Sequence, residues 1–387
     1  MMAKRGHGEG TVRYNADREY WEARFSYKDP NTGKAKRKKF TGAKQGEALS
    51  KGRKWLQEVA NGLLPDAYKI TVGQWLDTWL EEYVKPTKKP KTYEKYKSGV
   101  EQYIKPYIGN TPLSKVKAPD VQRLYNRLLK EGGKKKHGIS CYTVHGVHVN
   151  LHAAFDQALK VGLVTRNIIE AADAPRIIRC EVKPMTAQQA QKLLAIAKET
   201  GAREYIAVLL ALQTGMRKGE IFGLKWQDVD FDKMTISVQR ALSTTGKAVY
   251  IDAPKTARSR RLISITPNLA KELKQYRRLQ IEQKLAMGPN YDDQGFIIAT
   301  KIGTPYHPNE FHKVYRKMLK AIKLEEFDFH VLRHTHASIL FQQGVHPKVV
   351  QERLGHASIN MTMDIYGHLM PGMQETAVQA LNEVLCL

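Results

Sequence analysis

The residues best equipped for chemistry lie in one stretch near the end of the chain, between positions 329 and 368. His330 and Arg333 are three residues apart, so a helix would place both side chains on one face. His356 follows a Leu-Gly pair, and Tyr366 stands further along, directly before a Gly-His pair. A guanidinium and two imidazoles can bind a phosphate, and a phenol can attack one. The order of these side chains therefore indicates chemistry on a phosphate group.

Short helices are expected to position these side chains. Apolar residues recur at helical spacing after Asp328, and Gly344 marks the end of that helix. Proline at a first helical position and glycine just past the last one predict a second helix over 347–354. Ser358 can cap a third helix that runs to Tyr366. The stretch is thus predicted to fold as three helices that carry the four groups in sequence order.

The H-x-x-R, L-G-H and Y-G-H series resembles the C-terminal half of the tyrosine recombinases, the phage integrase family. The resemblance implies a transesterification in which Tyr366 attacks DNA and becomes a 3′-phosphotyrosine, which stores the bond energy for rejoining. The residues that it implies are catalytic are Arg217, Lys255, His330, Arg333, His356 and Tyr366.

Phosphate binding is assigned through this resemblance to two arginines and a histidine. Arg217, in the segment G-M-R-K-G-E, and Arg333 would bind the non-bridging oxygens bidentately, a task that suits arginine better than lysine. His356 would add a donor to the same oxygens. Glu220, three residues after Arg217, would support that arginine.

Proton transfer is assigned in the same way. Lys255, in P-K-T-A-R-S-R, would protonate the leaving 5′-oxygen, and His330 would accept or orient the proton of the tyrosine. Each residue also has a plainer interpretation, since Lys255 could be a surface lysine and Tyr366, one of 18 tyrosines, could belong to the core.

A metal site is the second kind of functional site that the histidines of this stretch could form. His330 and His334 have the i, i+4 spacing of zinc ligands on a helix, but Val331 stands where a zinc protease needs glutamate. No third ligand is evident, so we expect neither a metal nor a cofactor. His334, His336 and His368 are expected to be structural hydrogen-bonding residues.

Composition places the chain among binders of a polyanion. The 387 residues carry a net charge of +25, with hydrophobic content of an ordinary soluble protein. No apolar run is long enough to cross a membrane, and the first residues lack the apolar core of a signal peptide. The three cysteines are far apart and suggest neither zinc nor disulfides. We expect a cytoplasmic protein of a bacterial cell that associates with DNA.

Residues 1–65 are predicted to form a small three-stranded sheet followed by a helix, with turn residues at 29–33. A basic sheet of this kind can enter a major groove, whereas a solvated edge protected by lysines is the plainer alternative. The unit resembles the arm-binding domain of lambda-type and conjugative-transposon integrases. The residues expected to contact DNA here are Arg13, Arg24, Lys36, Arg37 and Lys38.

Residues 66–180 read as an all-helical domain that resembles the core-binding domain of the same family. Its aromatic residues at helical spacing are interpreted as core. Lysines between the predicted helices are expected to contact phosphates, namely Lys88, Lys89, Lys91, Lys134, Lys135 and Lys136.

Residues 181–387 would form the catalytic domain, mainly helical, with one three-stranded antiparallel sheet from strands over 234–242, 247–252 and 262–265. A final amphipathic helix after Pro371 would dock either on its own domain or, as we favour, on a neighbouring protomer. The predicted fold class is therefore multidomain α+β.

The resemblance as a whole implies a site-specific recombinase that acts through a Holliday junction to integrate and excise a phage or an integrative conjugative element. Its expected partners are double-stranded DNA at core crossover and arm sites, three further copies of the chain in a tetramer, and an accessory protein that bends DNA or sets direction. Two alternatives remain open, a non-catalytic DNA-binding regulator and a type IB topoisomerase-like enzyme.

Overall fold

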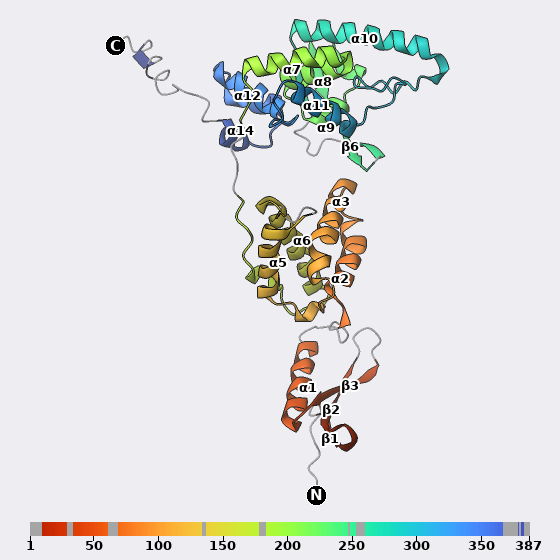
Figure 1. The fold of residues 1–387 in the computed structure, drawn as a ribbon, viewed down its shortest axis with the longest axis vertical. Coiled ribbons are helices and arrows are strands. Elements are labelled where there is room, and N and C mark those ends of the chain that lie inside the picture. Colours follow the sequence, from red (N-terminus) through yellow and green to blue (C-terminus); the bar gives the residue numbers. More distant parts are fainter. Residues whose placement is uncertain are drawn as a thin grey trace. The chain divides into compact units, whose positions relative to one another are not determined.

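The structure is a computed structural model, and it describes residues 10–28, 34–60, 69–133, 137–177, 183–246, 248–252, 260–366, 378 and 381–382. The chain divides into two compact units, Met1–Arg179 and Cys180–Leu387. In Figure 1 the colours follow the sequence from red at the N-terminus to blue at the C-terminus. The predicted start of the catalytic domain at residue 181 lies beside this division. The predicted boundary at residues 65–66 falls outside the described residues, so the assignment of three domains stays a prediction.

The first unit begins with a meander of three antiparallel strands in the order β1-β2-β3, followed by one helix. The alternation of apolar and charged residues in β2 gives the sheet one face that packs on the helix and one face that carries charge. The elements are β1 Thr11–Asn15, β2 Tyr20–Lys28, β3 Ala35–Gly42 and α1 Gln45–Ala60, with the short η1 Ala16–Arg18 between the first two strands.

The contact between α1 and the sheet is unusually close at one point. Phe25 is fully buried against Gly52, and a Cβ at position 52 would lie 1.9 Å from the Phe25 ring. Only glycine fits there, since no side-chain atom could be accommodated without moving the helix away from the sheet.

The rest of the first unit is helical, as the sequence predicted. A long run of helix from 72 to 84 and another from 90 to 108 each contain π-helical turns, labelled η3 and η4. The elements are α2 Val72–Thr78, η3 Trp79–Val84, α3 Pro90–Gly99, η4 Val100–Ile104, α4 Lys105–Ile108, η5 Leu113–Lys115, α5 Ala118–Glu131, α6 Cys141–Lys160 and η6 Ile168–Ala171.

The aromatic residues of these helices form the core that the sequence predicted. Trp75 and Trp79 are buried, and the Trp75 indole donates a hydrogen bond to the carbonyl of Ala154 at 2.8 Å. Tyr125 is buried as well, and its hydroxyl is 3.0 Å from Nδ1 of His148. The polar edges of Trp75 and Tyr125 therefore have hydrogen-bond partners inside the core.

The second unit is built around α8, whose residues are buried on nearly every side between neighbouring helices. Figure 1 shows α7 and α8 side by side, with α12 next to them. The elements are α7 Ala187–Thr200, α8 Ala202–Thr214, α9 Lys218–Phe222, η7 Trp226–Asp228, β4 Val229–Asp230, β5 Thr235–Val238, β6 Ala241–Thr245, β7 Ala248–Asp252, β8 Arg261–Ser264, α10 Pro267–Met287, η9 Gly288–Asn290, α11 Pro308–Ala321, α12 Val331–Gln342, α13 Pro347–Leu354 and α14 Ile359–Tyr366.

The strand pairing of this unit differs from the prediction. The three predicted strands do not form one sheet, because β5 pairs with β4 and β8, while β6 and β7 form a separate two-stranded hairpin. The first predicted strand is interrupted at Gln239 and Arg240, where Arg240 forms an ion pair with Asp228. This contact, distant in sequence, redirects the chain after Val238 and leaves the hairpin outside the sheet.

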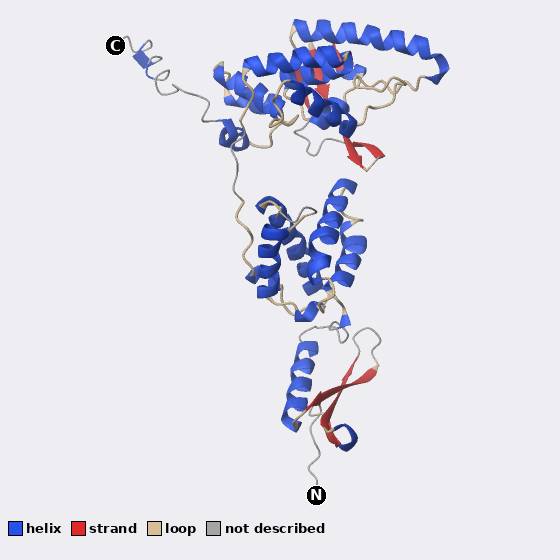
Figure 2. Cartoon of the chain, viewed as in Figure 1, coloured by secondary structure: helices blue, strands red, loops and turns tan. Residues whose placement is uncertain are grey.

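The predicted fold class is confirmed, since helices dominate and the sheets are small and antiparallel (Figure 2). Among the described residues, no helix is both long and apolar enough to cross a membrane.

Candidate active site

Arg217 is positioned by a sharp turn between α8 and α9. Gly215 ends α8 with φ of +65°, and a Cβ at this glycine would lie 2.6 Å from the ring of His336. Both the backbone conformation and the crowding therefore require glycine here. Two residues later, Arg217 caps α9, and its backbone N–H donates to a Glu220 carboxylate oxygen at 2.9 Å.

The Glu220 carboxylate lies between two guanidiniums. Arg217 Nη1 donates to Oε1 at 2.9 Å, and Arg261 Nη2 donates to Oε2 at 2.9 Å. Burial by itself would raise the pKa of Glu220, but the hydrogen bond and charge of Arg261, together with those of Arg217, lower it below its usual value. The carboxylate is thus held ionised, and the supporting role predicted for Glu220 agrees with these contacts.

Arg333 lies on α12 and is only 3% exposed. Its Nη1 donates to the carbonyl of Gly215 at 2.8 Å, whereas its buried Nη2 has no hydrogen-bond partner among the described residues. Burial, and next the charge of Arg217, lower the pKa of Arg333 to about 9. A buried guanidinium with an unsatisfied donor beside a second guanidinium is an arrangement that an anion would stabilise.

His356 follows Gly355, which ends α13 in the left-handed conformation with φ of +67°. Arg217 Nη2 reaches the carbonyl of Gly355 at 3.3 Å, so the turn containing His356 is tied to the first arginine. Nδ1 of His356 is 2.8 Å from the hydroxyl of Thr362. Burial, and next the charge of Arg333, lower the pKa of His356 to about 3, so the ring is neutral at physiological pH.

Tyr366, the last residue of α14, is 3% exposed and its hydroxyl lies 2.6 Å from Nδ1 of His334. Its ring stacks on Phe341 with centroids 5.7 Å apart. Burial raises the pKa of Tyr366 to about 12, although the charge of Arg333 acts in the opposite direction. His330, the residue predicted to orient this tyrosine, is exposed at the start of α12 and has its ring centroid 5.0 Å from that of His334.

Five of the six predicted catalytic residues fall on described residues, and all five belong to the second unit. The sixth, Lys255, lies outside the described residues, between β7 and β8, so its role stays a prediction. His368 and most of the segment after Pro371 lie outside them as well.

The sequence prediction missed two residues that touch this site. Arg261 joins Glu220 from the start of β8, and its Nε donates to the carbonyl of Arg353 at 2.7 Å. His334 was expected only to be a structural residue, yet it is the described partner of the Tyr366 hydroxyl. The basic run that contains Arg261 was visible in the sequence, but nothing local distinguished this arginine from its neighbours.

His336 is a structural hydrogen-bonding residue, as predicted. Its Nδ1 lies 2.8 Å from the carbonyl of Leu212, and its Nε2 accepts a hydrogen bond from Arg353 at 3.0 Å. Burial lowers its pKa to about 4, which fits a neutral ring that donates through Nδ1. His336 therefore links α12 by hydrogen bonds to the end of α8 and to α13.

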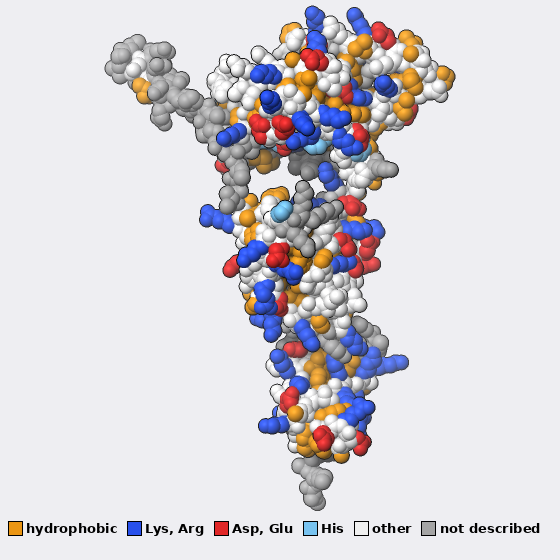
Figure 3. Space-filling view, viewed as in Figure 1, with side chains coloured by type: hydrophobic (Ala, Val, Ile, Leu, Met, Phe, Trp, Pro, Cys, Tyr) orange, Lys and Arg blue, Asp and Glu red, His pale blue; other side chains and the backbone are white. Residues whose placement is uncertain are grey.

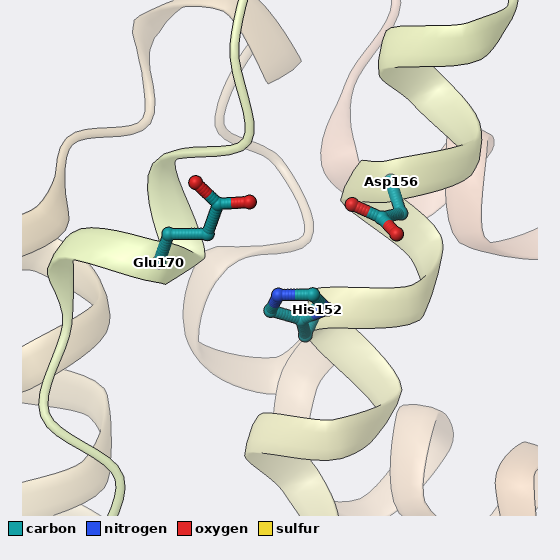
Figure 4. Close-up of side chains that lie close together, drawn as sticks. All are labelled: His152, Asp156 and Glu170. Carbon is teal, nitrogen blue, oxygen red and sulfur yellow. The ribbon is translucent and has the colours of Figure 1, made fainter.

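One group of side chains among the described residues could in principle hold a metal ion, and it lies far from these positions in sequence. His152 and Asp156 on α6 and Glu170 on η6 point toward a common space (Figure 4), with ligand atoms within 4.8 Å of one another. Glu170 is exposed, and Asp156 already accepts a hydrogen bond from Asn167 at 2.9 Å. Exposed acidic groups of this kind are common without a metal, so the cluster does not by itself indicate one.

The basic residues predicted to contact DNA in the N-terminal sheet divide between its two faces. By the strand register, Arg13, Arg24 and Arg37 share the face opposite α1. Lys36 and Lys38 lie on the α1 side, where the Lys38 ammonium is 4.3 Å from the centroid of the Trp55 ring.

The centre of the charged face is occupied by a buried carboxylate. Glu22 contacts Arg24 at 2.6 Å, Lys39 at 2.6 Å and Arg13 at 3.5 Å. The hydrogen bond from Lys39 is the largest cause that lowers the pKa of Glu22 to about 2. Lys39, which the sequence prediction left out, thus belongs to the same set of cations as Arg13 and Arg24.

In the helical part of the first unit, Lys88, Lys89 and Lys91 are exposed around the start of α3. Lys134, Lys135 and Lys136 lie outside the described residues. Figure 3 shows Lys and Arg side chains on both units.

Comparison with known families identifies both units. Residues 183–372 match the Phage integrase family, and residues 71–129 match the family described as phage integrase, N-terminal SAM-like domain. A protein named tyrosine recombinase XerC-like, from Caldanaerobacter subterraneus subsp. tengcongensis, is 32% identical over 386 residues, which cover 95% of this chain and 97% of that protein. The ICEBs1 integrase of Bacillus subtilis is 24% identical over 357 residues, covering 92% of this chain and 95% of the relative.

Solved structures show the same fold. The Tn1549 transposon integrase, in complex with transposon right end DNA, superposes with a TM-score of 0.66 at 22% identity, covering 82% of this chain and 100% of that one. A lambda integrase tetramer bound to a Holliday junction gives a TM-score of 0.57 at 20% identity, with coverage of 94% and 96%.

Proposed function

Because this chain belongs to the phage integrase family of tyrosine recombinases, we propose that Tyr366 is the nucleophile with which it breaks DNA strands. The protein is a site-specific recombinase, an enzyme that cuts and rejoins DNA by transesterification. The phenol oxygen would bond to the scissile phosphorus while the 5′-oxygen leaves, giving a 3′-phosphotyrosine. Attack by a 5′-hydroxyl of the exchanged strand would reverse these steps and release the tyrosine.

The phosphate would be bound by Arg217, Arg333 and His356. The observation that carries this assignment is the buried Nη2 of Arg333, which has no described partner although a second guanidinium lies close enough to lower its pKa. A non-bridging phosphate oxygen at this place would satisfy the donor and neutralise both charges, most strongly when negative charge builds up in the transition state. Glu220 and Arg261 would hold Arg217 in position for the same task.

The proton for the leaving 5′-oxygen would come from Lys255, and the proton of the phenol would pass to a histidine of α12. His330 is the candidate by motif, whereas His334 is the histidine in contact with Tyr366 in the described arrangement.

We further propose that the chain integrates and excises a phage or an integrative conjugative element. The N-terminal sheet would bind arm sites through Arg13, Arg24, Arg37 and Lys39. The helical domain would bind the core crossover site with Lys88, Lys89, Lys91 and the lysines at 134–136. Four copies would assemble on two duplexes, with an accessory protein that bends DNA or sets direction.

The nucleophile assignment is tested with a duplex taken from the junction of the element that encodes the chain, nicked near the crossover so that a cleaved strand is lost and the adduct accumulates. Tyr366→Phe should retain DNA binding and form no covalent adduct on a denaturing gel, because it lacks the attacking oxygen. Tyr306→Phe, whose ring packs under Arg203, is the matched control and should form the adduct at the wild-type level. Adduct formation by Tyr366→Phe would refute the assignment.

A further inference from the structure

Tyr366 is held by two contacts that come from one helix. Its hydroxyl is 2.6 Å from Nδ1 of His334, and its ring stacks on Phe341, seven residues further along α12. The two residues are two helical turns apart, so they lie on one face of α12 and meet the tyrosine at its polar and apolar ends. The contacts together explain why a residue expected to attack DNA is almost wholly buried.

The hydrogen bond joins a protonated phenol to a neutral imidazole. Burial, and next the charges of His330 and Arg333, lower the pKa of His334 to about 4, whereas burial raises that of Tyr366 to about 12. The phenol therefore keeps its proton in this arrangement, and it donates to Nδ1 of His334 in the tautomer that carries the imidazole proton on Nε2. This hydrogen bond would hold the tyrosine in place, and the phenol would stay protonated and therefore weakly nucleophilic.

The cluster that surrounds Tyr366 is small and separate from the main core of the unit. It consists of buried Ala337, Phe341, Val350, Leu354 and Tyr366, with Leu340 and Val345 packed against it. The main core of the unit is built from other residues, which run from Met185 to Leu332. Departure of the eight-residue α14 would thus cost the contacts of this cluster and the hydrogen bond between Thr362 and His356, while the main core stays packed.

We propose that His334 and Phe341 hold Tyr366 in a resting position, and that His334 is the positioning residue whose hydrogen bond must break before the tyrosine can reach the scissile phosphate. The inference rests on the proposed role of Tyr366 as the nucleophile. It adds that the chain restrains this nucleophile by a contact within one protomer, so that release of α14 precedes cleavage. His334 then acts on the rate through Tyr366 and not through contact with DNA.

The first test needs no DNA. Nitration of tyrosines by tetranitromethane in the full-length protein, followed by mass spectrometry of peptides, reports how often the Tyr366 ring is released. His334→Ala removes the acceptor and should raise the nitration rate of Tyr366 about two- to tenfold, the change expected for loss of one hydrogen bond. His334→Asn places an acceptor oxygen near the position of Nδ1 and should restore slow nitration. His346→Ala is the matched control, because the hydrogen bond of His346 goes to the backbone N–H of Lys348, where the side chain caps α13.

The second test measures single-turnover formation of the covalent adduct on the nicked junction duplex. If His334 restrains the tyrosine, His334→Ala should form the adduct about two- to tenfold faster than wild type, and His334→Asn should return the rate toward wild type. A slower or unchanged rate in His334→Ala would overturn the inference, since a residue that activates the nucleophile would give the opposite sign.

Two further variants distinguish failure of the proposed restraint from failure of the proposed nucleophile. Phe341→Leu removes the stacking and preserves apolar volume, so it should accelerate nitration and cleavage in the same direction even if His334→Ala folds poorly. Tyr366→Phe in the His334→Ala background should abolish the adduct. An adduct that persists in this double variant would refute the proposed nucleophile, whereas a tyrosine-dependent adduct that forms no faster in His334→Ala would refute the restraint alone.

Discussion

Glu220 offers a quantitative test of how the two arginines of the site are held. Its side chain is 5% exposed and contacts Arg217 and Arg261, of which Arg261 is 6% exposed. Glu220→Gln would remove the negative charge that both guanidiniums contact, and one of them, Arg261, is buried. Removing one partner of a buried ion pair costs about 3–5 kcal/mol, because the remaining charge stays desolvated.

This loss of unfolding free energy can be converted into a decrease in melting temperature. The second unit has about 200 residues, for which each kcal/mol shifts the melting temperature by about 2–4 °C. Glu220→Gln should therefore melt roughly 6–20 °C below wild type at neutral pH, as measured by calorimetry of the full-length protein. It should also cleave the nicked duplex far more slowly, because Arg217 loses the partner that orients it.

Glu310→Gln is a matched control. Glu310 and Lys313 have the same i, i+3 spacing as Arg217 and Glu220 and a similar distance of 2.8 Å, but their side chains are 54% and 68% exposed. An exposed pair contributes about 0–1 kcal/mol, so this variant should melt within about 4 °C of wild type. Equal melting temperatures for the two variants would refute the reasoning.

The effect of Glu220 must also depend on pH. Its pKa is lower in the folded protein than the ordinary value of 4.5, so its contribution to stability is complete above that value and is lost as the pH falls through the folded pKa. The difference in melting temperature between wild type and Glu220→Gln should therefore shrink below about pH 4.5. A difference that stays constant down to pH 3 would contradict the assigned charge state.

The remaining predictions concern the leaving group and the N-terminal sheet. Lys255→Ala should cleave an ordinary substrate poorly, and a 5′-phosphorothiolate substrate should restore much of the rate because sulfur leaves without a proton; absence of rescue would identify another acid. Deletion of residues 1–65 should leave cleavage of the core site intact and prevent integration between full attachment sites, whereas loss of core cleavage would argue against a separate module. Lys39→Ala should weaken arm-site binding more than Lys38→Ala in a gel-shift assay at fixed salt, because only Lys39 lies on the charged face of the sheet.

The local structure of the chemically important stretch was determined by the sequence. Apolar spacing, a proline at a first helical position and glycine at an end position predicted α12, α13 and α14 close to their observed bounds. These features depend on residues within one or two helical turns, so helix ends can be predicted from them without knowledge of the rest of the fold. The turn that carries Arg217 is also a local feature, because Gly215 has a positive φ that glycine adopts most readily.

Pairing between distant segments could not be read in this way. The predicted three-stranded sheet was wrong in its pairing because Arg240 binds Asp228, a contact between positions that no periodic pattern connects. Arg261 joins Glu220 across 41 residues for the same reason, and its neighbours in the basic run have equal local character. Strand periodicity places Lys38 and Lys39 on opposite faces, but only the register of β3 on β2 showed that Lys39 is the one that lies beside Arg24 and Glu22.

The partner of the proposed nucleophile was likewise decided by the tertiary structure. His330 is the N-cap residue of α12 and His334 lies one turn further along, so their spacing in the sequence indicates the same face and cannot choose between them. Packing of α14 against α12 brings the Tyr366 hydroxyl to His334 and leaves His330 exposed. The sequence alone determined which chemical groups are present and in what order, because reactivity belongs to side-chain types. Only the folded chain decided which of them touch, because burial and close packing depend on residues far apart in sequence.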